Sequence, residues 1–349
     1  MKNFGLIVML SCVLLLSCDK KNQVIRSFCY WKTDLNFDSK DDSLIEKINV
    51  HHMYVRFFDV DWNSFENEPV PVANIRNINL NKSHLEVTPS VFITNEVFLK
   101  TNNEQLDTLA VRIIRRIKEI SENRISEGIK KENYCKVNFK EILIDCDWSP
   151  KSRDNYFYLL KQIKKILPNK EITATVRLWQ YKYVTKAGTP PVDKGLLMCY
   201  NITKPNDFKT ENSIGTSREL AQYITHNKYK LKLDIALPIY SWAVVFRGNQ
   251  YKGIISDYGK LINDSINDKK LSANKYVLKE DIVAGKTYLR NGDVIRVEKI
   301  SEEELEKMIS IVKNKIEVDN QTKITFFSFD KKFVNDYGIQ NISKYYARF

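Results

Sequence analysis

The chain has 349 residues, of which 43% are hydrophobic and 28% charged, and its formal net charge is +12 at pH 7. This composition is typical of a folded globular protein and excludes a largely disordered chain. Only 11 residues are glycine, and neither G-x-x-x-x-G-K-[ST] nor G-x-G-x-x-G occurs, so we expect no phosphate-binding loop and no nucleotide cofactor.

The N-terminal residues predict export. Residues 1–17 contain one lysine and a long apolar run, which is typical of a signal peptide and too short for a membrane span. The segment Leu15-Leu16-Ser17-Cys18 resembles the lipobox of bacterial lipoproteins. The resemblance implies that Cys18 is diacylated and, after cleavage ahead of it, becomes the mature N-terminus, with 18–26 as a polar tether. The lipid anchor is then expected to hold the protein to a membrane of the bacterial cell envelope, on its periplasmic or surface face. The alternative is a plain signal peptide that happens to end in a cysteine.

The basic charge is spread along the chain. An exported, lipid-anchored protein rarely meets nucleic acid, so we expect no nucleic-acid partner and a basic surface that favours anionic glycans or lipid headgroups. We expect no metal site, because the histidines and cysteines lack metal-ligand spacing. Four cysteines beyond Cys18 are expected to be buried free thiols: Cys29, Cys135, Cys146 and Cys199.

Strand-like runs recur along the chain and alternate with helix-compatible sequence. The clearest helices are expected over 103–123, 153–167 and 301–316, where apolar residues recur at three- and four-residue spacing. This alternation predicts a (β/α)8 TIM-type barrel over 27–349, with a small insertion at about 249–300, after the seventh strand. A doubly wound sheet is the alternative, although its glycine-rich first turn is missing. The eight strands are expected at 27–31, 53–58, 87–94, 141–147, 172–179, 195–200, 233–240 and 324–329.

The candidate site lies where strands end, because barrel enzymes keep their chemistry at the carboxyl ends of their strands. Asp145 and Asp147 alternate with apolar residues, so both carboxylates are expected to face the barrel axis, where their repulsion raises one pKa. Around them we place polar and aromatic side chains from the other strand ends: Tyr30, Arg56, Asp59, Trp148, Arg177, Gln180, Tyr200, Asn201, Tyr240 and Trp242. The aromatic residues suit stacking on sugar rings, but they are equally compatible with a core. Arg56 or Arg177 could instead neutralise the acids in a purely structural network.

Three of these segments resemble motifs of the family 18 glycoside hydrolases. The run 145–149, Asp-Cys-Asp-Trp-Ser, resembles the fourth-strand pattern that ends in Asp-x-Asp-Trp-Glu. The run 198–201, Met-Cys-Tyr-Asn, is similar to Met-x-Tyr-Asp of the sixth strand, and 238–242 is similar to Pro-x-Tyr-Gly of the seventh. The resemblance implies the barrel fold over about 27–330 and a glycan as partner. The chain is also similar to Bacteroidota lipoproteins in which Asp-x-Asp ends a mid-chain strand.

The departures from these motifs bear on activity. In the family, the acid after Trp protonates the glycosidic oxygen, while the neighbouring Asp and the sixth-strand Tyr orient the substrate's acetamido group. Asp147 and Tyr200 match those positions, whereas Ser149 replaces the acid, Asn201 another acid and Ile142 the first Asp. A serine hydroxyl is too weak an acid to protonate a leaving group near neutral pH.

Three hypotheses therefore remain open. The chain is a hydrolase that uses another carboxyl pair, such as Asp147 with Asp59, Asp145 or Glu96, because hydrolysis needs only two suitably spaced carboxyls. Alternatively it is a glycan-binding lipoprotein without turnover. The third hypothesis is a structural envelope lipoprotein whose polar cluster is a satisfied network.

Overall fold

The structure is a computed structural model, and it describes residues 23–80, 84–122, 136–225, 229–256, 258, 270–284 and 287–349. The expected signal peptide, Cys18 and Cys135 lie outside these residues. Cys29, Cys146 and Cys199 are buried free thiols, as expected. No helix among the described residues is long and apolar enough to cross a membrane.

Eight parallel strands close into a barrel, which confirms the predicted fold class and excludes the open doubly wound sheet. The sheet order is β1-β17-β10-β9-β8-β7-β6-β3, and β1 also pairs with β3, so the sheet has no free edge within the ring. The strands are β1 (Ile25–Tyr30), β3 (His52–Asn63), β6 (Glu86–Ile93), β7 (Glu141–Asp145), β8 (Glu171–Arg177), β9 (Lys194–Met198), β10 (Lys232–Pro238) and β17 (Lys323–Phe327). All eight lie where the apolar runs predicted them.

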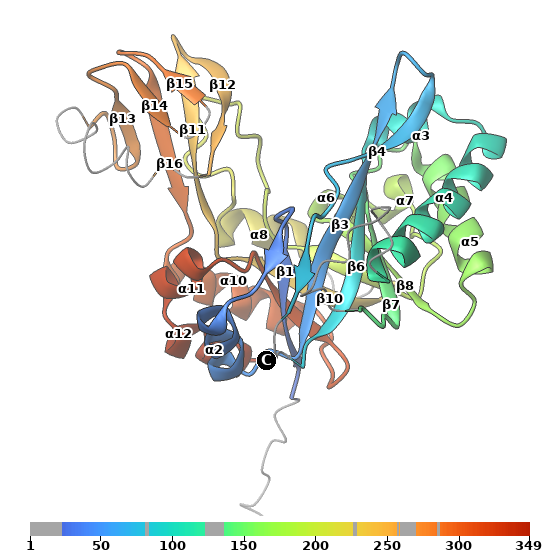
Figure 1. The fold of residues 1–349 in the computed structure, drawn as a ribbon. Helices are drawn as coiled ribbons and strands as arrows, with labels where there is room; N and C mark the ends of the chain where they lie inside the picture. Colours follow the sequence, from blue (N-terminus) through green and yellow to red (C-terminus); the bar gives the residue numbers. More distant parts are fainter. Residues whose placement is uncertain are drawn as a thin grey trace, which may run out of the picture.

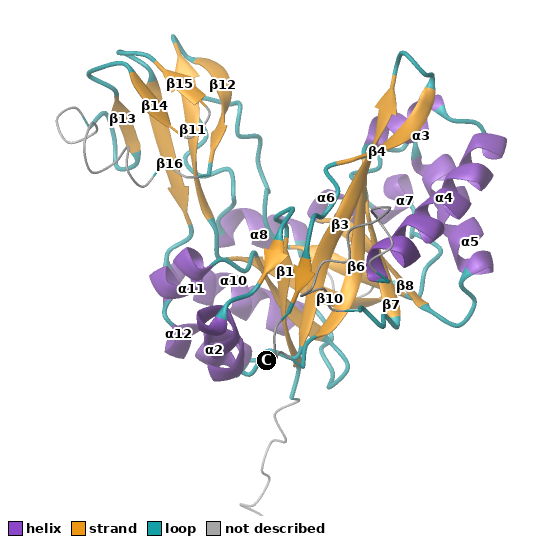
Figure 2. Cartoon of the chain, viewed as in Figure 1, coloured by secondary structure: helices purple, strands orange, loops and turns teal. Residues whose placement is uncertain are grey.

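Helices pack around the outside of the ring (Figures 1 and 2). The longest, α4 (Asn103–Ser121), begins at a capping box in which Asn102 and Gln105 exchange hydrogen bonds, and its apolar stripe is buried. The others are α2 (Ser39–Ile48), α3 (Asn95–Lys100), α5 (Arg153–Ile166), α6 (Leu178–Lys182), α7 (Val184–Ala187), α8 (Ser217–Tyr223), α10 (Glu302–Lys315), α11 (Lys331–Tyr337) and α12 (Ile339–Tyr346). The helices predicted over 103–123, 153–167 and 301–316 are α4, α5 and α10.

A second, four-stranded antiparallel sheet follows β10, in the order β12-β11-β16-β13. Its strands are β11 (Ser241–Arg247), β12 (Gln250–Ile255), β13 (Lys275–Val277) and β16 (Val294–Lys299), and the short pair β14 (Ile282–Ala284) and β15 (Thr287–Leu289) lies beside it. The extra sheet begins at Ser241, before the insertion expected from about residue 249. It has its own small core, formed around residues such as Val245 and Ile295.

A β-hairpin rises opposite this sheet. Strand β3 continues beyond the ring and pairs with β4 (Glu68–Val72), so that hairpin and second sheet project from the same end of the barrel (Figure 1). The two-stranded pair β2 (Leu35–Asn36) and β5 (Ile78–Asn79) lies in the neighbouring connections. Since β3 ends in this hairpin, the projecting end is the carboxyl end of the parallel strands, where barrel proteins place their sites.

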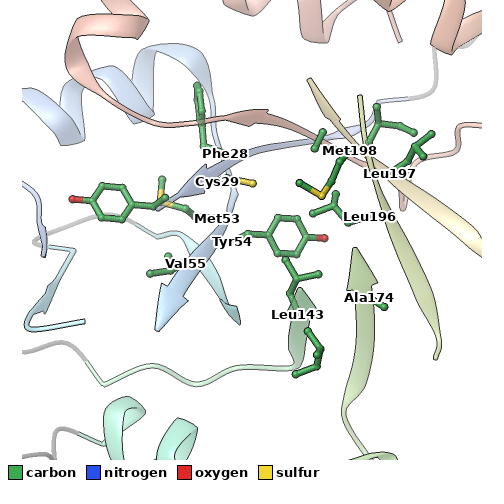
Figure 3. Close-up of a cluster of buried hydrophobic side chains, with 14 of the residues drawn as sticks. Phe28, Cys29, Met53, Tyr54, Val55, Leu143, Ala174, Leu196, Leu197 and Met198 are labelled. Carbon is green, nitrogen blue, oxygen red and sulfur yellow. The ribbon is translucent and has the colours of Figure 1, made fainter. Parts of the chain in front are cut away.

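Both faces of the barrel strands are packed, and Figure 3 shows buried side chains of β1, β3, β7, β8 and β9. At the amino ends of the strands the packing is ionic. Lys323 Nζ lies 2.7 Å from Glu141 Oε2 and 3.5 Å from Asp234 Oδ2, and all three side chains are at most 8% exposed. Tyr54 donates a hydrogen bond to Asp234 at 2.9 Å. This buried network, here called the barrel floor, closes the end opposite the candidate site.

Candidate functional site

The two aspartates of β7 occupy different environments. Asp145 ends the strand, is 6% exposed, and accepts a hydrogen bond of 2.7 Å from Thr175 Oγ1 of the neighbouring β8. Burial, helped by the negative charge of Asp147, raises the pKa of Asp145 to about 7. The side chain of Asp147 lies past the end of the strand and is 54% exposed. We expected strand alternation to turn both carboxylates toward the barrel axis, but β7 ends at Asp145, so the alternation does not extend to Asp147.

Arginines neutralise two of the candidate acids. Arg177 Nε lies 3.3 Å from Asp147 Oδ1, and Arg56 binds Asp59 with both Nε and Nη2, the Nε–Oδ1 distance being 2.6 Å. The two contacts of the Arg56–Asp59 pair fix the position of that carboxylate. Glu96, the other acid considered, lies on α3, where it pairs with Lys100 at 2.6 Å. Asp145 is thus the one of these four acids without a cationic partner in an ion pair.

Ser149 lies in the turn between β7 and α5. Its backbone N–H donates to Ser152 Oγ at 2.9 Å and to Asn95 Oδ1 at 3.3 Å, and its hydroxyl lies 3.2 Å from that of Ser152. These bonds order the turn that leads into α5. They supply no group acidic enough to protonate a glycosidic oxygen near neutral pH.

Aromatic rings line the carboxyl end of the barrel. Tyr200 stacks on Phe327 with centroids 4.9 Å apart, and Tyr240 meets Trp242 edge-on at 5.2 Å. Trp31 contacts Phe327 from the other side at 5.7 Å. Burial raises the pKa values of Tyr200 and Tyr240 well above the ordinary value, so both phenols stay protonated and can donate hydrogen bonds.

The polar atoms of this aromatic cluster differ in what they bind. Tyr240 donates to Asn201 Oδ1 at 2.5 Å, and Asn201 adopts a left-handed backbone conformation (φ 52°) directly after Tyr200. The Tyr200 hydroxyl makes no hydrogen bond to any residue that the structure describes. The Tyr200 side chain is 4% exposed, and it lines the cavity described next.

A cavity of about 400 Å³ opens beside these rings. Its wall combines aromatic, amide, hydroxyl and cationic side chains, and carries no carboxylate among the described residues. The lining is Arg177, Leu178, Trp179, Tyr200, Asn201, Ile202, Thr203, Lys204, Pro205, Tyr223 and Trp242. Trp179 and Trp242 are partly exposed. We call this space the mouth cavity; a volume of this size suits one or two sugar rings.

Arg56 and Tyr240, both predicted to bind a ligand, do not line the mouth cavity. Three further residues of that prediction also lie away from it. The Tyr30 ring packs on Phe37 on the helix side of the barrel, because Ser27 and Cys29 take the inward positions of β1. The Trp148 indole is fully buried, stacks on Tyr156 of α5 and donates to the Ala187 carbonyl at 2.9 Å. Neither ring is available to a sugar, so both predictions were wrong.

Gln180, the third of these residues, is fully buried and holds other groups in place. Its Oε1 accepts from the Arg177 backbone N–H at 2.7 Å, and its Nε2 donates to the Trp148 carbonyl at 2.9 Å. It thus joins the ends of β7 and β8 and fixes the base of Arg177. It acts as a support for the cavity wall and does not line it.

An ion pair that the sequence did not indicate fixes Trp242. The Trp242 indole donates to Glu298 Oε2 at 2.7 Å, and Arg296 Nε lies 2.6 Å from Glu298 Oε1. The two charged side chains are fully buried. Arg296 also donates to the carbonyls of Pro205 and Asp207, so β16 holds both Trp242 and the loop after β9 that lines the cavity.

No known protein-family model matches the chain, and neither does any curated protein. Among solved structures, the spore cortex-lytic enzyme SleL of Bacillus cereus is similar, with 12% identity and a TM-score of 0.48 over 95% of this chain and 75% of that one. A chitinase from Ipomoea carnea has 11% identity and a TM-score of 0.43, over 92% and 99% of the two chains. The C-terminal domain of Legionella pneumophila ChiA has 10% identity and a TM-score of 0.42, over 93% and 96%. The likeness is remote, and the eight-stranded parallel barrel is established by the strand pairing itself.

Proposed function

We propose that the protein binds a glycan in the mouth cavity. The observation that carries this proposal is the wall of the cavity, where the unpaired Tyr200 hydroxyl lies among two partly exposed indoles, Trp179 and Trp242. Indole faces stack on the apolar C–H faces of sugar rings, and a few fixed polar groups give such a site its orientation and specificity. The resemblance of the strand-end motifs to family 18 glycoside hydrolases supports the same class of ligand.

Binding without turnover is favoured by the state of the carboxylates. Glycoside hydrolysis requires one carboxyl that is protonated and another that is ionised, on opposite sides of the bond. Ser149 replaces the acid of the resembled motif, while Asp59 and Asp147 are tied to arginines. A bound glycan would therefore find these carboxylates in ion pairs with arginine and would find no acid at the position of the resembled motif.

One observation favours hydrolysis as a second candidate function. Asp145 has a pKa of about 7 and lies two residues from Asp147, so Asp145 can hold a transferable proton near neutral pH beside a second carboxyl group. In this mechanism Asp145 would donate its proton to the leaving oxygen, and Asp147 would activate water or attack the sugar. The 6% exposure of Asp145 opposes it, because the proton must reach the glycosidic oxygen.

The two functions are separated by one experiment. The protein without its first 18 residues is titrated with bacterial and host glycans, including N-acetylglucosamine polymers, by calorimetry, while released reducing ends are measured in parallel. Binding that is lost in Trp242→Ala but kept in the surface control Lys161→Gln, with no release, supports a binding protein. Release that disappears in both Asp145→Asn and Asp147→Asn establishes hydrolysis. Failure of every glycan to bind contradicts the proposal.

We also propose that the chain is exported and anchored by lipid at Cys18, in the cell envelope. The support is the N-terminal sequence, with its apolar run and lipobox-like end. Growth with an alkyne fatty acid should label the full-length protein and leave Cys18→Ser unlabelled. Equal labelling of the two, or none in either, contradicts the anchor.

A further inference from the structure

We propose that the ligand of the mouth cavity is an acidic glycan, whose carboxylate or sulfate is bound by Arg177 and Lys204. This inference rests on the proposed function and narrows its substrate class. It starts from the charge of the cavity wall, which carries these two cations and no carboxylate among the described residues. A wall of one sign selects a ligand group of the opposite sign.

The Arg177 guanidinium has N–H donors that make no contact with any described residue. Its Nη2 donates to the Asn201 carbonyl at 3.1 Å, and its Nε faces Asp147 at 3.3 Å. Its Nη1 has no hydrogen-bond or ion-pair partner within the described ranges. A guanidinium presents five N–H donors in a planar fork, so an anionic ligand group can bind without displacing either existing contact. The side chain is 20% exposed and held at its base by Gln180, which limits the entropy lost on binding.

Lys204 supplies the second cation. It is exposed on the loop after β9, and its ammonium makes no ion pair with any residue that the structure describes. The loop itself is not free to move away, because Arg296 binds the carbonyls of the adjacent Pro205 and of Asp207. The cation is therefore carried by a loop that is tied to the second sheet.

A third cation lies near the outer part of the wall. Lys182 Nζ sits 5.6 Å from the centroid of Tyr223, a lining residue, and 5.3 Å from that of Tyr183. The only carboxylate in direct contact with these three cations, among the described residues, is Asp147. The local balance is therefore positive, in keeping with the net charge of +12 for the whole chain.

Neutral atoms of the wall complete the recognition of a sugar. The Tyr200 hydroxyl makes no hydrogen bond to any described residue and belongs to a side chain that lines the cavity. Ring hydroxyls of the ligand can bind the phenol, and the indole of Trp242 offers an apolar face fixed by Glu298. The wall thus offers a cationic group for the acid and a stacking surface for the ring that carries it.

The test compares matched pairs of glycans by calorimetry. The carboxylate arm uses oligogalacturonate against its methyl ester and hyaluronan oligosaccharides against N-acetylglucosamine oligomers. The sulfate arm uses a 6-sulfated N-acetylglucosamine oligomer against the unsulfated oligomer. The variants are Lys204→Gln, Arg177→Lys and the control Lys161→Gln, which removes an exposed lysine from α5.

We expect at least one acidic member to bind more tightly than its neutral partner and to weaken as salt rises. Lys204→Gln should weaken that binding by about tenfold. Arg177→Lys should also weaken it, because lysine lacks the planar, two-donor geometry of the guanidinium. Lys161→Gln should leave the binding unchanged. Binding of neutral glycans that equals or exceeds that of the acidic ones overturns this inference but leaves the proposed function intact. Acidic binding that ignores both variants overturns the assignment to Arg177 and Lys204. Absence of binding by every glycan overturns the proposed function and this inference with it.

Discussion

Removing the cation from the barrel floor should destabilise the protein strongly. In Lys323→Met, the carboxylates of Glu141 and Asp234 lose the ammonium that lies 2.7 and 3.5 Å away. At an effective dielectric constant of about 20, each contact is worth roughly 5 kcal/mol before desolvation of the lysine is subtracted. Breaking a buried ion pair by removing one partner typically costs about 3–5 kcal/mol, because the remaining charge is buried without compensation. Burial already raises the pKa of Asp234, so this carboxyl can take up a proton in the variant. The proton uptake limits the loss of stability to this range.

The assay is urea unfolding at pH 7, followed by far-ultraviolet circular dichroism. The expected loss of about 3–5 kcal/mol corresponds to a fall in melting temperature of roughly 4–7 °C for a chain of this length. Lys232→Met is the matched control, because Lys232 makes an exposed pair with Asp319 at 2.9 Å, and we expect no measurable change. Lys323→Met should also cost less when Glu141→Gln is already present. The reasoning is refuted if Lys323→Met unfolds at the same urea concentration as the wild type.

Three further predictions concern the candidate site. The pKa of Asp145 is about 7 in the folded protein, whereas its ordinary value is 3.8. Between these two pH values the folded protein holds a proton that the unfolded chain releases. The contribution of Asp145 to stability is therefore fully present below about pH 4 and is lost as the pH rises through 7. Asp145→Asn should therefore gain stability relative to the wild type between pH 4 and 8 in urea titrations; a constant difference contradicts the shifted pKa. Trp148→Phe should lower the melting temperature while changing glycan affinity less than twofold, because the indole is buried against Tyr156 and does not line the cavity. A large loss of affinity would show that Trp148 contacts the ligand after all. Glu298→Gln should lower stability, since it leaves Arg296 buried without its ion-pair partner, and it should weaken glycan binding because Glu298 holds the Trp242 indole. The fluorescence of Trp242 should change as the ring becomes less fixed; unchanged emission contradicts the role of Glu298 in positioning Trp242.

The barrel was predictable because its signals are local. Each parallel strand is buried on both faces, so it appears as a short apolar run such as 233–240, and each neighbouring helix shows its own stripe. The same alternation predicted that Asp145 faces the barrel axis, and its side chain is buried against Thr175 of β8. It failed for Asp147, because the strand had already ended, and for Tyr30, which lies one position out of phase with Cys29.

The long-range contacts that hold the site residues in place were not predictable from the sequence. Trp148 had the right sequence position for a ligand contact, but its burial depends on Tyr156 and Ala187, which no local pattern connects to it. Glu298 reaches Trp242 across 56 residues, and Arg296 reaches Pro205 across 91. Such contacts arise only when the second sheet folds against the loop after β9. Phe327, whose ring lies between Trp31 and Tyr200, likewise appeared in the sequence only as part of a strand.

The most direct test of the account is calorimetric titration of the protein without its first 18 residues with the glycan panel, in wild type and Trp242→Ala. We predict that at least one glycan binds the wild type, that Trp242→Ala loses at least tenfold in affinity while its fold is retained, and that Lys161→Gln binds as the wild type does. Equal binding by wild type and Trp242→Ala, or no binding of any glycan by the folded wild type, would contradict the assignment of the mouth cavity as a glycan site.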